Sequence, residues 1–117
     1  MKDLEELTAY LRKYANDRDW NQFHSPKNLA MALSVEASEL LEHFQWLTEE
    51  QSAQLKPEEL SPVADEIADV FLYLLRLSDT LGIDIIEAAR SKTQKNEEKY
   101  PADLVRGSSK KYTHYQK

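Results

Sequence analysis

Two pairs of acidic residues lie inside the most apolar stretches of this chain and limit how those stretches can pack. Glu36 and Glu39 are three residues apart, as are Glu66 and Asp69, so in a helix both carboxylates of a pair project from one face. Buried carboxylates without partners are strongly disfavoured, so several that face inward need a compensating cation. Oxygen ligands suit a hard ion such as Mg²⁺, with Mn²⁺ as a substitute. The pairs predict a metal site between two packed helices.

Each pair also has a simpler explanation. Glutamate is a good helix former, so the first pair can lie on a solvated face. Asp65 and Glu66 follow an expected helix start, where acidic side chains complement the helix dipole. Asp69 lies too far into its helix for that explanation and leads into an apolar run at 70–75. Both pairs together, on neighbouring helices, favour the metal site.

Length and composition predict one helical domain over residues 1–117, with a basic tail from about residue 101. The two glycines and four prolines stand where helices are expected to end, which favours an all-α protein. The sequence contains no cysteine, so disulfides, thiolate metal sites and a cysteine nucleophile are excluded.

The charge and the apolar runs restrict the partners. A net charge of −6 argues against binding a nucleic-acid polymer, which usually needs a basic surface. The N-terminus lacks the apolar region of a signal peptide, and no apolar run reaches membrane-spanning length. We therefore expect a cytoplasmic protein without a membrane partner.

Hydrophobic periodicity and capping residues predict four helices. Their expected ranges are about 3–17, 26–46, 62–81 and 85–99. The expected N-cap residues are Asp3, Ser25, Ser61 and Asp84. The polar connection at 48–60 carries one short turn that starts at Thr48 and Gln51, and Gly82 ends the third helix. Short connections make neighbouring helices antiparallel, so we expect a four-helix arrangement.

Aromatic residues gather in the segment that precedes the second helix. Trp20, Phe23 and His24 lie there, and Trp46 follows the first acidic pair. These side chains can cover the core, or they can stack on a nucleobase, whose π face any aromatic ring can contact. His24 is a candidate donor to a base edge or a phosphate, although a lone histidine is more often structural.

The fourth helix carries polar residues along one face. They are Lys92, Lys95, Asn96 and Lys99. Such a face is ordinarily solvated. Opposite a carboxylate cluster, it can instead bind phosphates, because a polyphosphate needs cations to neutralise it.

The acidic pairs resemble the E-x-x-E plus E-x-x-D metal signature of MazG-like nucleoside triphosphate pyrophosphohydrolases. The segments 18–33 and 35–46 are similar to the branch of that family that includes dCTP pyrophosphatase, as are 95–101 and the tail from Gly107. The resemblance spans nearly the whole chain. One departure is Val35, which stands where many MazG proteins carry a further glutamate.

The resemblance implies a four-helix MazG-like bundle that hydrolyses a (deoxy)nucleoside triphosphate to the monophosphate and pyrophosphate, as in nucleotide-pool sanitation. dCTP or a modified pyrimidine nucleotide is the expected substrate. The implied Mg²⁺ ligands are Glu36, Glu39, Glu66 and Asp69, with Glu39 orienting or deprotonating the attacking water. The implied base pocket comprises Trp20, Phe23, His24, Trp46 and Tyr73. Phosphate or sugar oxygens would be bound by Lys92, Asn96 and Lys99. A homo-oligomer, either a dimer or a tetramer with shared sites, is also implied.

Two alternatives remain open from the sequence. One is a non-catalytic helical interaction protein that binds a metal or a nucleotide. The other is a related all-α hydrolase that acts on dUTP or on damaged nucleotides.

Overall fold

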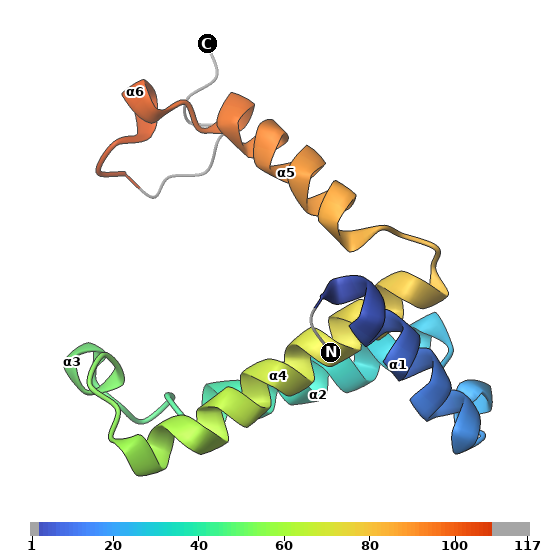
Figure 1. The fold of residues 1–117 in the computed structure, drawn as a ribbon. Helices are drawn as coiled ribbons and strands as arrows, with labels where there is room; N and C mark the ends of the chain where they lie inside the picture. The colour runs from blue at the N-terminus through green and yellow to red at the C-terminus, as the bar shows by residue number, and fades with distance from the viewer. Residues whose placement is uncertain (1–2, 109–117) are drawn as a thin grey trace. The chain divides into compact units, whose positions relative to one another are not determined.

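The computed structural model describes residues 3–108, and every regular element in that range is helical (Figure 1). The helices are α1 (Leu4–Asp17), the 3₁₀ helix η1 (Asn21–Phe23), α2 (Pro26–Glu42), α3 (Glu49–Ser52), α4 (Pro57–Thr80), α5 (Ile85–Lys99) and α6 (Ala102–Val105). The expected all-α class is confirmed. None of these helices combines the length and the apolar character that crossing a membrane requires.

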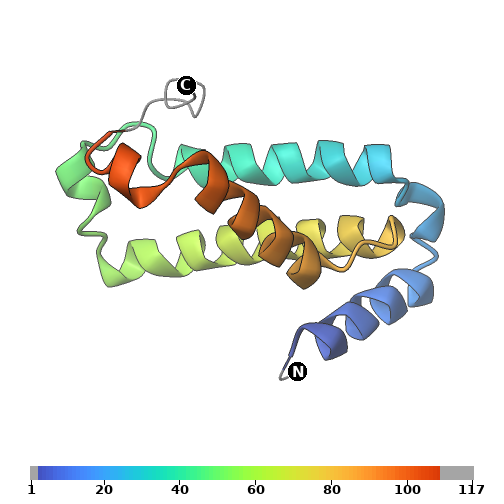
Figure 2. The same ribbon diagram turned by 90° about the horizontal axis from the view of Figure 1, so that it is seen from above.

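The chain forms two compact units, Met1–Gly82 and Ile83–Lys117. In the first unit, α2 and α4 lie side by side and run antiparallel, and α1 packs on α4 (Figure 2). The buried apolar residues of this unit are Ala15, Leu29, Val63 and Leu75. The second unit contains α5 and α6 and is described by itself. The assignment of residues 1–117 to one domain stays a prediction.

Three of the expected N-caps are present. The side chains of Asp3, Ser25 and Asp84 each accept a hydrogen bond from the backbone N–H three residues later, at 2.8–3.1 Å. Each bond satisfies a donor that the first turn of a helix leaves unpaired. The turn at Thr48 is also confirmed, because Thr48 and Gln51 form a reciprocal capping box at the start of α3. Gly82 follows α4 with a φ of 68°, a left-handed conformation that glycine adopts without strain.

The expected start of the third helix at Ser61 is wrong. α4 begins at Pro57 with Lys56 as its N-cap, and Pro62 lies inside the helix. The Lys56 N–H donates to Glu59 Oε1 at 3.0 Å, so Pro57 and Glu59 supply the same start signals earlier in the chain. Pro62 lacks only one backbone donor, and the apolar contacts of this long helix outweigh that loss.

The expected end of the second helix near Trp46 is also wrong. α2 ends at Glu42, after which the N–H groups of His43 and Phe44 bond to carbonyls three residues back, at 3.2 and 2.9 Å. Such turns keep apolar residues at nearly helical spacing, so periodicity alone does not reveal the change.

The predicted basic tail begins with a short helix. Residues Ala102–Val105 form α6 directly after Pro101. The rest of the predicted basic tail, residues 109–117, lies outside the described range.

The two Ser-Pro sequences give a direct test of the observed helix starts. Ser25→Ala removes a side-chain cap and should lower the free energy of unfolding by about 1 kcal/mol. Ser61→Ala should change it by less than about 0.5 kcal/mol, because Ser61 is an exposed residue within α4. Urea denaturation followed by circular dichroism measures both. A larger loss for Ser61→Ala would show that α4 begins at Pro62 instead.

Candidate active site

The antiparallel packing of α2 against α4 brings the acidic residues together. α2 supplies Glu36 and Glu39, and α4 supplies Glu66. One carboxylate oxygen from each of these three residues lies within 4.8 Å of the others. We call these three residues the carboxylate cluster.

Two oxygens of the carboxylate cluster are buried without a partner. Glu36 Oε2 and Glu66 Oε2 accept no hydrogen bond from any residue in the described range. Burial, together with the neighbouring carboxylates, raises the pKa of Glu36 to about 7. Burial also raises the pKa of Glu66. The cluster therefore favours a bound proton or a cation over three bare charges, and its all-oxygen donor set fits a hard divalent ion.

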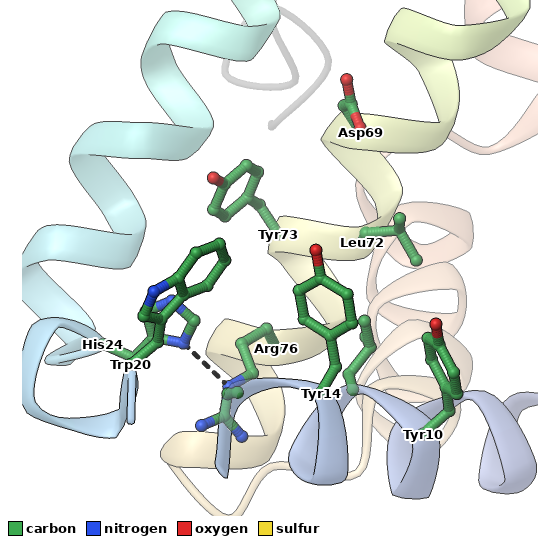
Figure 3. Close-up of a pocket in the computed structure, with 10 residues that line it drawn as sticks. Tyr10, Tyr14, Trp20, His24, Asp69, Leu72, Tyr73 and Arg76 are labelled. Atoms are coloured by element: carbon green, nitrogen blue, oxygen red, sulfur yellow. Dashed lines mark hydrogen bonds between the residues drawn. The ribbon is translucent and has the colours of Figure 1, made fainter. Parts of the chain in front are cut away.

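Asp69 links the cluster to a cavity. It lies three residues after Glu66 on α4 and lines a cavity of about 380 Å³, a size typical of small-molecule sites (Figure 3). The cavity is bounded by α1, by the segment between α1 and α2, and by α4. Its lining residues are Tyr10, Leu11, Tyr14, Ala15, Trp20, His24, Asp69, Leu72, Tyr73 and Arg76.

Aromatic rings form most of the cavity wall (Figure 3). The Tyr14 and Trp20 rings meet edge to face with their centroids 5.7 Å apart, and the Trp20 and His24 rings are 6.2 Å apart. Burial raises the pKa of the Tyr73 hydroxyl, and so do the charges of Glu36 and Asp69. Tyr73 is therefore close enough to the carboxylates to feel their charge.

Arg76 fixes the position of His24 in the cavity wall and of the neighbouring Asn21. Its Nε donates to His24 Nδ1 at 3.3 Å, and its Nη2 donates to Asn21 Oδ1 at 2.8 Å. A guanidinium nitrogen also lies 3.6 Å from Asp79, and Asp79 accepts a hydrogen bond from Arg12 of α1 at 2.7 Å. Burial and the Arg76 charge both lower the pKa of His24.

The structure brings some of the predicted residues together. Trp20, His24 and Tyr73 line the same cavity as Asp69. Phe23 and Trp46 do not line it, and they are 58% and 87% exposed. Lys92, Asn96 and Lys99 lie on α5 in the other unit, so their part in a phosphate site stays a prediction.

Among the lining residues with polar side chains, the sequence analysis missed Tyr10, Tyr14 and Arg76. Arg76 follows Asp69 and Tyr73 at i+7 and i+3, so the face that carries the two predicted residues also carries the missed one. That spacing is a signal in the sequence. No local signal assigns Tyr10 and Tyr14 to the cavity, because the packing of α1 on α4 is a tertiary contact.

A MazG-like family model matches residues 31–114 of the chain. The chain belongs to the MazG-like family. It is similar to dCTP pyrophosphatase 1 of Homo sapiens and of Mus musculus, with 40% identity to each over 112 residues, or 94% of this chain. It spans 66% of the length of those relatives. Its fold is similar to that of a pyrophosphatase from Archaeoglobus fulgidus, with 45% identity and a TM-score of 0.79 over 83% of this chain and 91% of that one.

The carboxylate cluster should make the metal-free protein sensitive to pH. The pKa of Glu36 lies above its ordinary value of 4.5, so the folded protein holds a proton there that the unfolded chain releases. Stability from this group is thus present at low pH and is lost as the pH rises from about 4.5 to about 7. With a chelator present, Glu36→Gln should raise the melting temperature relative to wild type, and this difference should grow from about pH 5 to about pH 8.

Glu42→Gln is the matched control, since Glu42 lies exposed at the end of the same helix. Its melting temperature should stay parallel to that of the wild type across the same pH range. If Glu36→Gln behaves like Glu42→Gln, the three carboxylates do not share a crowded site in solution.

Proposed function

We propose that this MazG-like protein is a metal-dependent nucleoside triphosphate pyrophosphohydrolase, which cleaves a (deoxy)nucleoside triphosphate to the monophosphate and pyrophosphate. The observation that carries the proposal is the carboxylate cluster, whose two unpartnered buried oxygens adjoin an aromatic cavity through Asp69. A cation site beside a stacking surface is what a metal-bound triphosphate attached to a planar base requires. The names of the relatives support the same chemistry.

Mg²⁺ is the proposed ion, with Mn²⁺ as a substitute, and its proposed ligands are Glu36, Glu39, Glu66 and Asp69. Three of these residues already point oxygens at one another, and the fourth lies one helical turn further along α4. When bound, the ion supplies neutralisation of the phosphate charge and a lower pKa for a coordinated water.

The protein's own groups would complete the reaction. Glu39 is the proposed residue that orients the attacking water or accepts its proton, because its carboxylate belongs to the cluster. Trp20 and the neighbouring tyrosines would stack on the base and exclude water from it. The Tyr73 hydroxyl, near the carboxylates, would hold the sugar–phosphate part of the substrate between the base and the cluster.

dCTP or a modified pyrimidine deoxynucleotide is the proposed substrate. The named activity of the human and mouse relatives supports this choice. The cavity offers large stacking surfaces and few polar groups, and stacking alone tolerates every base. We therefore expect a moderate preference, with measurable activity on other deoxynucleotides.

We also propose that the chain works as a homo-oligomer, either a dimer or a tetramer. Several large apolar side chains on α2 and α4 are exposed in the single chain, although their helices form the centre of the first unit. They are Met31, Val35, Leu41, Ile67, Phe71 and Leu74. Burying such a surface against a second copy would stabilise a small protein with few buried residues. In such an assembly, Trp46 and Phe23 could reach a base pocket of another copy.

Activity should depend on the inward carboxylates. Asp69→Asn and Glu39→Gln should each abolish pyrophosphate release from dCTP with Mg²⁺, because each removes a metal-binding charge. Asp65→Asn is the matched control, since Asp65 is an exposed acid one turn earlier on α4, and it should retain wild-type turnover. Circular dichroism would confirm that all three variants remain helical.

The same assay, run on dCTP, dTTP, dUTP and dATP, tests the function itself. A wild-type protein that releases no pyrophosphate from any nucleotide would contradict it. A melting temperature that rises with Mg²⁺ and nucleotide, without product, would support the non-catalytic binding protein instead.

Removing the stacking surface should weaken substrate binding. Trp20→Ala should raise the KM for dCTP by about 5-fold to 150-fold, because base–aromatic stacking contributes about 1–3 kcal/mol. The kcat should change little, since Trp20 is not one of the proposed metal ligands. Trp46→Ala is the matched tryptophan change. It should raise KM only if an assembled oligomer brings Trp46 to the base, and light scattering on the same samples shows the assembly state. An unchanged KM for Trp20→Ala would exclude the cavity as the base pocket.

A further inference from the structure

The contact between Arg76 and His24 specifies the protonation state of the imidazole. Arg76 Nε–H donates to His24 Nδ1 at 3.3 Å, in a partly buried position. A guanidinium has only donors and stays charged in proteins, so the nitrogen that faces it must carry a lone pair. In a neutral imidazole, the proton then lies on the opposite nitrogen, Nε2.

We propose that Arg76 is a positioning residue that holds His24 as the neutral imidazole with its proton on Nε2. The cavity then presents a group that can only donate a hydrogen bond to the acceptor edge of a pyrimidine. This inference rests on the proposed function for the class of ligand. It adds the residue that determines which edge of the base His24 can read.

The surroundings of Arg76 keep its guanidinium in that position. The side chains of Arg76 and Asp79 are only 12% and 14% exposed. Asn21 accepts from Arg76 Nη2 at 2.8 Å, and Asp79 supplies a negative charge 3.6 Å from Nη1. Arg12, on α1, donates to Asp79 through two nitrogens. The guanidinium is thus bound by His24, by Asn21 of η1 and by Asp79 of its own helix, and Asp79 is bound in turn by Arg12 of α1.

Charge also opposes the other protonation state. A protonated His24 would carry donors on both nitrogens and would place a second positive charge against Arg76. Burial disfavours that charge further, and both effects lower the pKa of His24. The charged groups that face His24 are the cation of Arg76, with Asp79 and Arg12 behind it, and the carboxylate of Asp69, which lines the same cavity.

A group that can only donate a hydrogen bond distinguishes cytosine from uracil and thymine. Cytosine carries acceptors at N3 and O2, whereas uracil and thymine carry an N3–H donor where cytosine has its N3 acceptor. An Nε2–H group placed at N3 would bond to cytosine and would meet a second donor in uracil, leaving both unpaired. The tyrosine hydroxyls of the cavity can rotate to donate or accept, so they do not enforce this difference.

The first arm of the test measures the tautomer and needs no catalysis. Nitrogen-15 NMR of the His24 imidazole in the metal-free protein should show the proton on Nε2 in the wild type. Arg76→Lys, which keeps a charged donor, should preserve that state, whereas Arg76→Met should yield a mixture of tautomers. Arg90→Met is the matched control, because Arg90 forms an exposed pair with Glu87 on α5, and it should resemble the wild type. A wild-type proton on Nδ1, or an unchanged tautomer in Arg76→Met, would overturn the proposal.

The second arm measures base discrimination by titrating dCMP and dUMP into the metal-free protein and following the indole N–H resonance of Trp20, which lines the same cavity and is present in every variant. The wild type should prefer dCMP, Arg76→Met should lose about tenfold of that preference, and Arg76→Lys should recover most of it. His24→Gln, whose amide can rotate to donate or accept, should lose the preference while keeping the fold. If Arg76→Met and His24→Gln each weaken the binding of dCMP and dUMP equally, Arg76 has a purely structural role and the proposal is overturned.

This design separates the inference from the proposed function. Failure of the wild type to release pyrophosphate would contradict the pyrophosphohydrolase while leaving the tautomer and the dCMP preference measurable. Pyrophosphate release by the wild type, combined with a wild-type proton on Nδ1, would contradict the inference alone.

Discussion

The crowding of three carboxylates between α2 and α4 is the constraint on which the rest of the structure depends. Glu36, Glu39 and Glu66 bring oxygens within 4.8 Å of one another, and two buried oxygens have no partner in the described range. Like charges at that distance oppose the packing of the two helices that carry them. The apolar contacts that offset this repulsion within one chain are few, with Leu29 and Val63 among the buried residues. A cation or proton that neutralises the carboxylate cluster therefore stabilises the first unit, because it binds at the interface between α2 and α4 on which the fold depends.

One face of α4 arranges the site in a linear order. Glu66, Asp69, Tyr73 and Arg76 follow one another at steps of three, four and three residues, so they project from nearly the same side of the helix. The face begins in the carboxylate cluster, continues along the cavity and ends at the residue that binds His24. A single rigid helix therefore sets the distance between the proposed metal and the proposed base-reading group. Loops would hold that distance less well than a continuous backbone ladder does.

Local signals in the sequence predicted most helix caps and the acidic pairs, whereas tertiary contacts determine which other residues join the site. The caps at Ser25 and Asp84 depend on a few adjacent residues, and the structure has them as expected. The predicted helix start at Ser61 is wrong because Pro57 offers an equivalent start nearby, and local chemistry alone cannot rank the two. The acidic pairs were visible because buried charge is rare in an apolar run. Arg12 was not assigned to the site, because only the packing of α1 on α4 brings it beside Asp79.

The charges at the two ends of the cavity show how a chain with a net charge of −6 would bind the proposed anionic nucleotide. The cluster end is acidic, so a bare triphosphate would be repelled there, and only a triphosphate that shares its charge with a cation fits. At the other end, the largely buried guanidinium of Arg76 is bound to His24, Asn21 and Asp79, so its nitrogens are already engaged within the protein. That end is walled mainly by aromatic rings and suits an uncharged base. This asymmetry would orient the proposed nucleotide before any base-specific contact forms, because the reversed orientation would place phosphates among aromatic rings and the base among carboxylates.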